Sequence, residues 1–179
     1  ETRDLLVLST VNLQTLSTAQ VAAFTTDQVV ALSTTQVVGM RSAQIAALTT
    51  DQIVALSTTQ VANLSTANAY ALTTTQVAVV ETGDLVVLGT TNLAALSTNQ
   101  VVAFTTDQVL ALQTVQVQSL ATLQAAALRT QQVVALSTTQ VLALTTLQLV
   151  GLRSAQIAAM LTEQIVAIST TQAAALSTA

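Results

Sequence analysis

The sequence contains no cysteine, histidine, lysine, proline or tryptophan. Without cysteine, the chain has no disulfide, no thiol nucleophile and no thiolate metal ligand, and the redox compartment stays open. Without histidine and lysine, it also lacks the commonest general bases and amine nucleophiles. We therefore expect no enzyme, with no catalytic, cofactor-binding or metal-binding residues and no cofactor.

Charged residues are also scarce, at 7% of the chain, and the formal net charge is -4. All of the positive charge lies on four arginines, Arg3, Arg41, Arg129 and Arg153. Affinity for nucleic acid comes from many contacts between Lys or Arg and phosphates. Four scattered arginines therefore predict that nucleic acid is not a partner.

Long apolar runs are missing too, because Ser, Thr or Gln interrupts each run after a few residues. A membrane-spanning helix needs about 20 consecutive apolar residues, so we expect no membrane insertion. One repeat pattern runs through residues 1–179, which predicts a single domain. Since the pattern starts at Glu1 and stops within a repeat at Ala179, we expect an excerpt of a longer chain.

The chain is built from one octapeptide, seen most clearly at residues 57–64 as Ser-Thr-Thr-Gln-Val-Ala-Asn-Leu. Every residue whose number divides by eight is large and apolar, and we number this residue as position eight. Position two is Thr in every repeat except at Ser42 and Ser154. Position four is Gln, with these exceptions: Asp4, Asn12, Asn68, Asp84 and Asn92. Position five is apolar and position seven is small. A strict short period indicates a repeat array.

The octad predicts an all-α solenoid of very short helices, one for each eight-residue repeat. Eight residues advance a helical wheel by about 800°, so one continuous helix would rotate its apolar stripe by about 80° per repeat. The chain must therefore change direction in every repeat. In a helix over positions two to eight, positions four, five, seven and eight share one face, and positions three and six lie opposite. The first set should face the interior.

The start of each helix has two interpretations. The Thr at position two is a good N-cap, and Asp27, Asp51, Asp107 and Glu163 would then lie in first turns, where the helix dipole favours acids. Alternatively, positions one and four form a capping box, as in Ser57-x-x-Gln60. A β-solenoid is the competing fold, because Thr and Val are strand formers. The scarcity of Gly, Asn and Pro at tight corners and the abundance of Ala and Gln favour helices.

Longer regularities bear on the size of a coil. Position six alternates between larger and smaller residues, and residues 1–37 resemble residues 81–117 at a spacing that is a multiple of sixteen. We therefore expect two octads per coil and about eleven coils. The spacing from Asp27 to Asp51 is three octads, and it would instead suit a coil of three octads.

The column of Gln residues at position four needs hydrogen-bond partners if it is half-buried. The nearest candidates are the unpaired backbone groups at the helix ends of the same coil or the next one. We therefore predict a ladder of Gln side chains bonded to backbone along the rod.

No set of residues forms a chemical site. The acids are spread along the chain, and the densest pair, Glu81 and Asp84, is interpreted as the start of a longer repeat in preference to a weak cation site. Phe24 and Phe104 replace Leu at position eight and should lie in the core, whereas Tyr70 at position six should lie on the surface. The rows of Ser and Thr at positions one to three are interpreted as helix caps, with a lattice-binding array as the alternative.

Two families share parts of this pattern. Residues 24–32 (Phe-Thr-Thr-Asp-Gln-Val-Val-Ala-Leu) resemble the first helix of TAL-effector DNA-binding repeats. The second helix and the base-reading loop of that family have no counterpart here, so DNA recognition is not implied. The whole chain is similar to the Ala-Leu-Ser/Thr-Thr-x-Gln-Val octapeptide tracts of very large bacterial repeat proteins. This resemblance implies a tandem-repeat spacer or filament that is exported or displayed on the cell surface.

We therefore expect a non-enzymatic structural protein, an elongated rod that acts as a stalk, adhesin spacer or filament subunit. Solenoid ends expose apolar surface unless they are capped, so we expect self-association, end to end or lateral. The alternative is a binding module for ice, a glycan or a protein that uses the Thr and Ser rows or positions three and six. The expected location is extracellular or at the cell surface.

Overall fold

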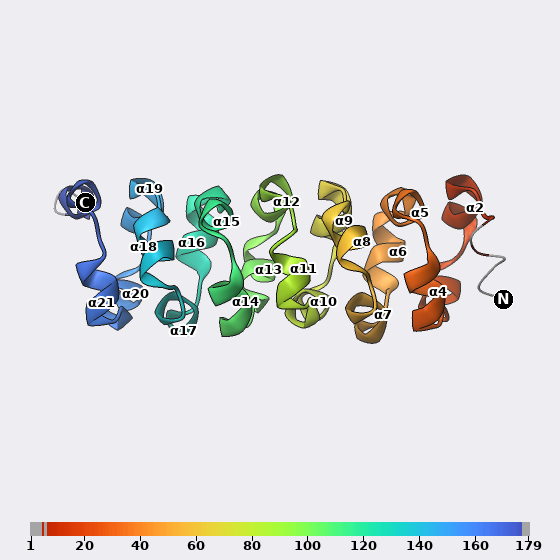
Figure 1. The fold of residues 1–179 in the computed structure, drawn as a ribbon, viewed down its shortest axis with the longest axis horizontal. Helices are drawn as coiled ribbons and strands as arrows, with labels where there is room; N and C mark the ends of the chain where they lie inside the picture. The colour runs from red at the N-terminus through yellow and green to blue at the C-terminus, as the bar shows by residue number, and fades with distance from the viewer. Residues whose placement is uncertain (1–4, 6, 177–179) are drawn as a thin grey trace.

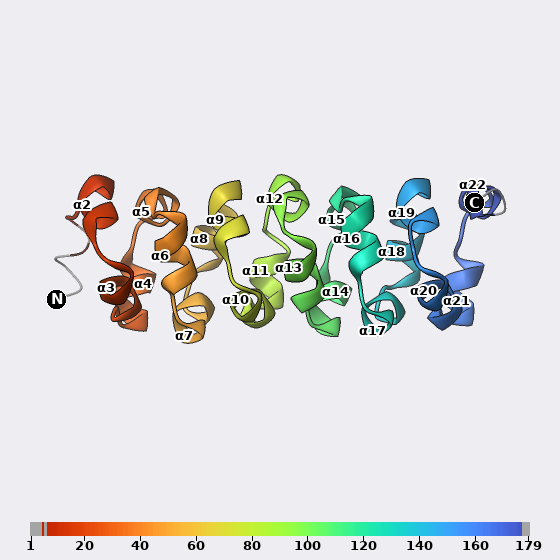
Figure 2. The same ribbon diagram turned by 180° about the vertical axis from the view of Figure 1, so that it is seen from behind.

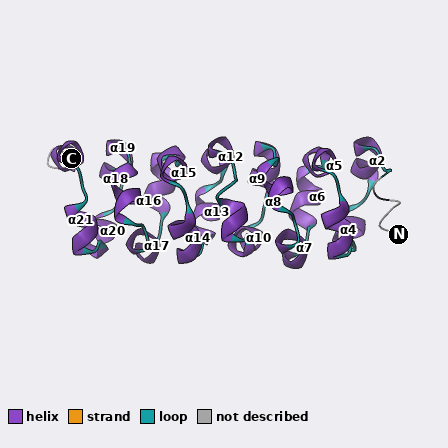
Figure 3. Ribbon diagram, in the orientation of Figure 1, coloured by secondary structure: helices purple, strands orange, loops and turns teal. Residues whose placement is uncertain are grey.

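The computed structural model describes residues 5 and 7–176, and every regular element in this part of the chain is an α-helix (Figure 3). The helices stack along one axis into an elongated rod, with α2 at one end and α22 at the other (Figures 1 and 2). The expected all-α solenoid with one short helix per octad is confirmed. No strand occurs among the described residues, so the alternative β-solenoid is wrong.

The 21 described helices have four to seven residues each and follow one another in octad phase. Their bounds are α2 Thr10–Thr15, α3 Thr18–Ala22, α4 Thr26–Ala31, α5 Thr34–Gly39, α6 Ser42–Ala47, α7 Thr50–Val54, α8 Thr58–Ala62, α9 Thr66–Ala71, α10 Thr74–Val79, α11 Thr82–Leu85, α12 Thr90–Ala95, α13 Thr98–Ala103, α14 Thr106–Ala111, α15 Thr114–Ser119, α16 Thr122–Ala127, α17 Thr130–Val134, α18 Thr138–Ala143, α19 Thr146–Val150, α20 Ser154–Ala159, α21 Thr162–Val166 and α22 Thr170–Leu176.

One coil of the solenoid contains three octads. Each helix packs against the helices three before and three after it, as α9 packs against α6 and α12. The expected coil of two octads, and with it the count of about eleven coils, is wrong. The evidence for two octads came from the long repeat spacing and from position six, whose side chains mostly face outward and whose backbone carbonyls alone bond to the next coil. The three-octad spacing of Asp27 and Asp51 is the one that matches the coil.

The columns of stacked helices wind around the rod axis. Helices that contact each other are three apart in the chain. In the upper row of helices in Figure 1, however, α9 follows α5 and α19 follows α15, so at these two places the neighbouring helix in the row is four further along the chain. A helix column therefore drifts off this edge as it runs along the rod, and the next column takes its place.

The interior is formed by positions four, five and eight, which are three of the four positions that the helical wheel predicted to face it; the fourth, position seven, is only half-buried. In the octad that contains α14, Gln108, Val109 and Leu112 are buried, whereas Asp107 and Leu110 are exposed. The same pattern recurs through the middle of the rod, and position seven is mostly half-buried. A helix this short has no stability of its own in water, so the shared core must stabilise it.

Each helix starts with an N-cap at position one, not at position two. In α8, Ser57 has extended backbone angles and its hydroxyl accepts a hydrogen bond from the Gln60 amide, while the Gln60 Oε1 accepts one from the Ser57 amide. This is the capping box, so the alternative interpretation of the helix start is confirmed and the N-cap at Thr58 is wrong. The acids Asp27, Asp51, Asp107 and Glu163 do lie in first turns.

Most of the described helices end at position eight, which turns to near-extended angles, whereas others, such as α7, end one residue earlier. Leu112 has φ -57 and ψ 137, and its amide donates to the Val109 carbonyl. Among the described residues, none has a positive φ. The corners therefore need no Gly or Asn, which explains how a chain with four glycines and no proline turns in every octad.

The Thr at position two meets position seven of the coil above. A Cβ placed on Gly39 would lie 2.9 Å from the Thr10 Cγ2, and one placed on Gly151 would lie 2.6 Å from the Thr122 Cγ2. Each glycine lies one coil after its Thr and five residues further along the octad, so a position-two Thr contacts position seven of the next coil. Close contact between the Thr methyl and a small residue gives a packing reason for both positions, of which sequence analysis had interpreted only the Thr, as a helix cap.

Replacing Gly151 by Ala should lower the free energy of unfolding by about 1–3 kcal/mol, because the new methyl overlaps Thr122 and lies 3.0 Å from the Leu147 carbonyl. Gly83→Ala is the matched control: nothing lies within 4 Å of its added Cβ, so the free energy should rise by about 0.5–1 kcal/mol. Urea unfolding followed by far-UV circular dichroism measures both. Equal effects of the two substitutions would contradict this packing.

Candidate functional site

The most regular polar feature of the rod is the Gln side chain at position four, which joins one coil to the next. The Oε1 of Gln60 accepts the Ser57 amide of its own helix at 2.8 Å. Its Nε2 donates to the carbonyls of Leu32 at 2.7 Å and Val29 at 3.0 Å, which end α4 in the coil below. One buried amide therefore pairs the start of one helix with the end of another.

This arrangement recurs along the described chain. From Leu8 to Leu144, each position-eight carbonyl accepts a hydrogen bond of 2.6–3.2 Å from the position-four amide 28 residues later, except that of Leu56. We call this column the amide ladder. The predicted ladder of Gln side chains bonded to backbone is confirmed. Helix ends leave backbone amides and carbonyls unpaired, and the ladder satisfies both kinds inside the core.

The amide ladder tolerates Asn with fewer bonds. Asn68 donates to Met40 at 3.2 Å and Asn92 donates to Leu64 at 2.7 Å, so each reaches only the position-eight carbonyl. The shorter side chain explains the loss of the second bond. Asp84 is the exception: it is 5% exposed, and no described residue donates a hydrogen bond to its side chain.

Two of the arginines, Arg41 and Arg153, also bond to the coil below. Arg41, Arg129 and Arg153 all occupy position one, where most octads have Ser or Thr. Arg41 donates to the Leu16 carbonyl at 3.0 Å, and Arg153 donates to the Ala126 carbonyl at 2.8 Å. Sequence reasoning missed these bonds between coils. The signal was the shared octad position of the three residues.

The structure brings no chemical constellation together. Among the described residues, no group of three or more His, Cys, Asp or Glu side chains lies close enough to hold a metal ion. Asp27, Asp51, Asp107 and Glu163 are exposed on separate helices, Tyr70 is 62% exposed, and Phe104 is buried. Phe24 is half-buried against the core, so the expected places of the three aromatic residues are confirmed.

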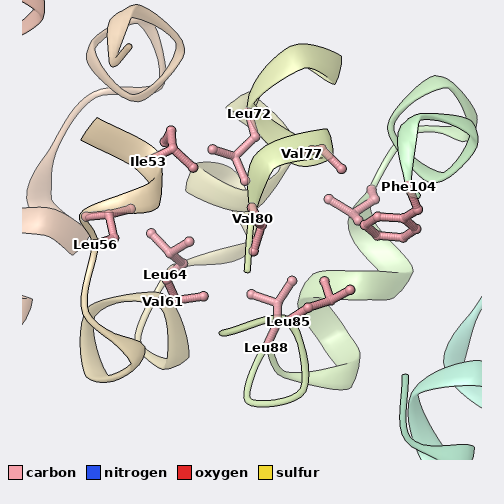
Figure 4. A pocket seen from close by; sticks show the side chains of 11 residues that line it. Ile53, Leu56, Val61, Leu64, Leu72, Val77, Val80, Leu85, Leu88 and Phe104 are labelled. Carbon is pink, nitrogen blue, oxygen red and sulfur yellow. The ribbon is translucent and has the colours of Figure 1, made fainter. Parts of the chain in front are cut away.

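An apolar cavity lies inside the core, in the part of the rod that runs from α7 to the end of α13. It has a volume of about 20 Å³ and is lined by aliphatic side chains and Phe104 (Figure 4). Pockets for small molecules usually have several hundred Å³ and a few convergent polar groups. This cavity is therefore a packing gap rather than a binding pocket.

None of the helices within the described residues is long and apolar enough to cross a membrane. The fold and the amide ladder together define the class of the protein: a tandem-repeat helical solenoid built from octapeptides. The profile of the ALTTAQ repeat family matches residues 1–34, 29–58 and 77–114, which together make up more than half of the chain. The chain belongs to the ALTTAQ repeat family. No curated protein and no solved structure matches it.

Replacing Gln52 by Leu should lower the free energy of unfolding by about 1–3 kcal/mol, because the Thr49 amide and the Phe24 carbonyl lose buried partners. The Gln52 side chain is 2% exposed, so water cannot replace them. Urea unfolding measures the change.

Gln20→Leu is the matched control for this substitution. Gln20 has the same capping bond to the Ser17 amide, but it is exposed and its amide nitrogen donates to no described residue. Gln20→Leu should therefore lower the free energy of unfolding by less than about 1 kcal/mol. An equal loss in the two variants would show that the cap, and not the bond between coils, provides the stability.

Proposed function

We propose that the chain is a non-enzymatic structural rod that serves as a stalk, spacer or filament subunit. The observation that carries this proposal is the amide ladder: within the described chain, from Leu8 to Leu144, each position-eight carbonyl accepts a bond from the position-four amide of the next coil, with the single exception of Leu56. Enzymes and specific binders differ from this pattern, because they gather unlike residues at one place. Here the outward positions vary along the rod without forming such a place.

A solenoid of this kind suits a spacer because its length depends only on the number of coils. Each coil packs on its neighbours and on nothing else, so coils can be added without a new core. The surface has few charges and many Ser and Thr hydroxyls. The hydroxyls at position one are engaged as caps, as that of Ser57 is, which leaves less support for an array that binds ice or a glycan.

Self-association end to end is part of this proposal. At the last described coil, Ile165 occupies position five, which is buried in the middle of the rod, yet it is 44% exposed. A following coil, either of the same chain or of another copy, would cover this surface. We propose an exported or cell-surface location solely because the chain resembles the octapeptide tracts of large bacterial repeat proteins.

The alternative function is a binding module for another protein. It is favoured by Leu123 and Leu147, which occupy position three on the neighbouring helices α16 and α19 and are 76% and 72% exposed. Exposed apolar side chains that lie next to each other often mark interaction sites. Two residues make a small patch, so the rod remains the better supported function.

Removing one coil should shorten the rod and change nothing else. Deleting residues 97–120 takes out three octads and keeps the octad phase across the new junction. Small-angle X-ray scattering should show a particle shorter by about 8–10 Å, the distance between packed helices, with an unchanged cross-section. Ice recrystallisation and glycan-array assays on the full chain should be negative. A change in cross-section, or saturable binding in either assay, would contradict the spacer function.

A further inference from the structure

The amide ladder has one gap, at Leu56. Leu32 precedes Gln60, whose amide bonds to its carbonyl, by 28 residues. Leu56 precedes Asp84 by the same number of residues, so Asp84 occupies the place of the missing donor. Asp84 is the only described position-four residue that is neither Gln nor Asn. In every other described octad from α5 to α22, an amide nitrogen at position four donates to the coil below. Asp84 is only 5% exposed, yet its side chain receives no hydrogen bond and forms no ion pair with a described residue.

The geometry at the gap follows from the two Asn octads, because Asp and Asn have the same shape. The Asn92 Nδ2 lies 2.7 Å from the Leu64 carbonyl, and the Asn68 Nδ2 lies 3.2 Å from that of Met40. In the octad of Asp84, a carboxylate oxygen takes the place of that donor nitrogen. Two oxygen acceptors then lie close together at this corner. No fully buried side-chain oxygen in the described residues lacks a hydrogen-bond partner, so the Asp84 carboxylate is in contact with solvent, and a cation from solution can reach it and lie between the two acceptors.

A second carboxylate belongs to the same corner. Side chains at positions one and four lie side by side, as the Ser57 Oγ and the Gln60 Oε1 do at 3.1 Å. Position one of the Asp84 octad is Glu81, so α11 has no side-chain cap. Only two octads have Glu at position one, and the same two octads are the only ones with Asp at position four. The pairs are Glu1 with Asp4, and Glu81 with Asp84. The first pair lies outside the described residues.

We propose that Asp84, Glu81 and the Leu56 carbonyl form a binding site for one Ca²⁺ ion, which replaces the missing amide in the ladder. Ca²⁺ binds carboxylate and carbonyl oxygens at about 2.3–2.6 Å with flexible geometry, so neighbouring ligands lie about 3 Å apart. That separation matches the spacing at the Asn octads. The two carboxylates balance the charge of the ion, and water completes its coordination, because Glu81 is exposed.

The choice of Ca²⁺ over other cations follows from the ligands. The site offers only oxygen atoms, which excludes metals that need sulfur or imidazole. Mg²⁺ demands near-ideal octahedral geometry and gives up its water reluctantly, which a corner of fixed backbone does not favour. With only two carboxylates, the affinity should lie in the range of extracellular modules, with a Kd of roughly 10⁻⁴–10⁻³ M.

The test is thermal unfolding of the full chain in EDTA and in increasing CaCl₂ at constant ionic strength. All variants carry Asp4→Asn, so that the first octad contributes no second carboxylate pair. The parent should gain roughly 3–6 °C in Tm at about ten times the Kd. Isothermal titration calorimetry should show one site per chain, and MgCl₂ should give a smaller shift.

Asp84→Asn restores the donor that Asn92 provides in its own octad. This variant should melt in EDTA close to the temperature of the parent in saturating CaCl₂, and it should not respond to CaCl₂. Asp107→Asn is the matched control: Asp107 is exposed in the first turn of α14, so its removal should leave the Ca²⁺ response unchanged.

Three results would overturn the site: a parent that does not respond to CaCl₂, an Asp84→Asn variant that still responds, or a response lost in Asp107→Asn. These outcomes are independent of the spacer function, because the length of the rod does not depend on the ion.

Discussion

A buried side-chain amide that bonds in two directions governs this fold. The Gln60 oxygen accepts the Ser57 amide at the start of its helix, and its nitrogen donates to the Leu32 carbonyl at the end of a helix one coil below. Very short helices leave most of their backbone groups unpaired at the ends. In this rod, one residue per octad satisfies both kinds of group, and it does so within the apolar core, where an unpaired group would be most costly.

The remaining positions are constrained by this bond. Position eight must turn without a left-handed residue so that its carbonyl points to the next coil, as Leu112 does at φ -57 and ψ 137. Position seven is Ala or Gly in most octads, and the Thr methyl at position two approaches it most closely at Gly39 and Gly151. Positions three and six face outward and are free to vary. The result is a rod whose coils are interchangeable. This uniformity suits a spacer better than a protein with one catalytic or ligand-binding site.

The interior could be predicted because the octad has a fixed phase on a helical wheel, which places Gln108, Val109 and Leu112 together. The ladder could be predicted because a buried amide needs partners. The coil size could not, since the alternation at position six lies on side chains such as that of Tyr70, which faces solvent; position six contributes to the stacking of coils only through its backbone carbonyl. The Leu56 gap was equally hidden, because it appears only when the coil size is known and Asp84 is placed one coil and four positions after its acceptor.

Hydrogen exchange of the Gln side-chain amides, followed by NMR, tests the ladder most directly. Gln44 to Gln172 have buried amide groups bonded to the coil below, so their side-chain NH₂ protons should exchange slowly and show nuclear Overhauser contacts to the position-eight residue of that coil. Gln20, which is exposed, should exchange at the rate of a free amide. Uniformly fast exchange of all these side chains would show that the coils are held by apolar packing alone.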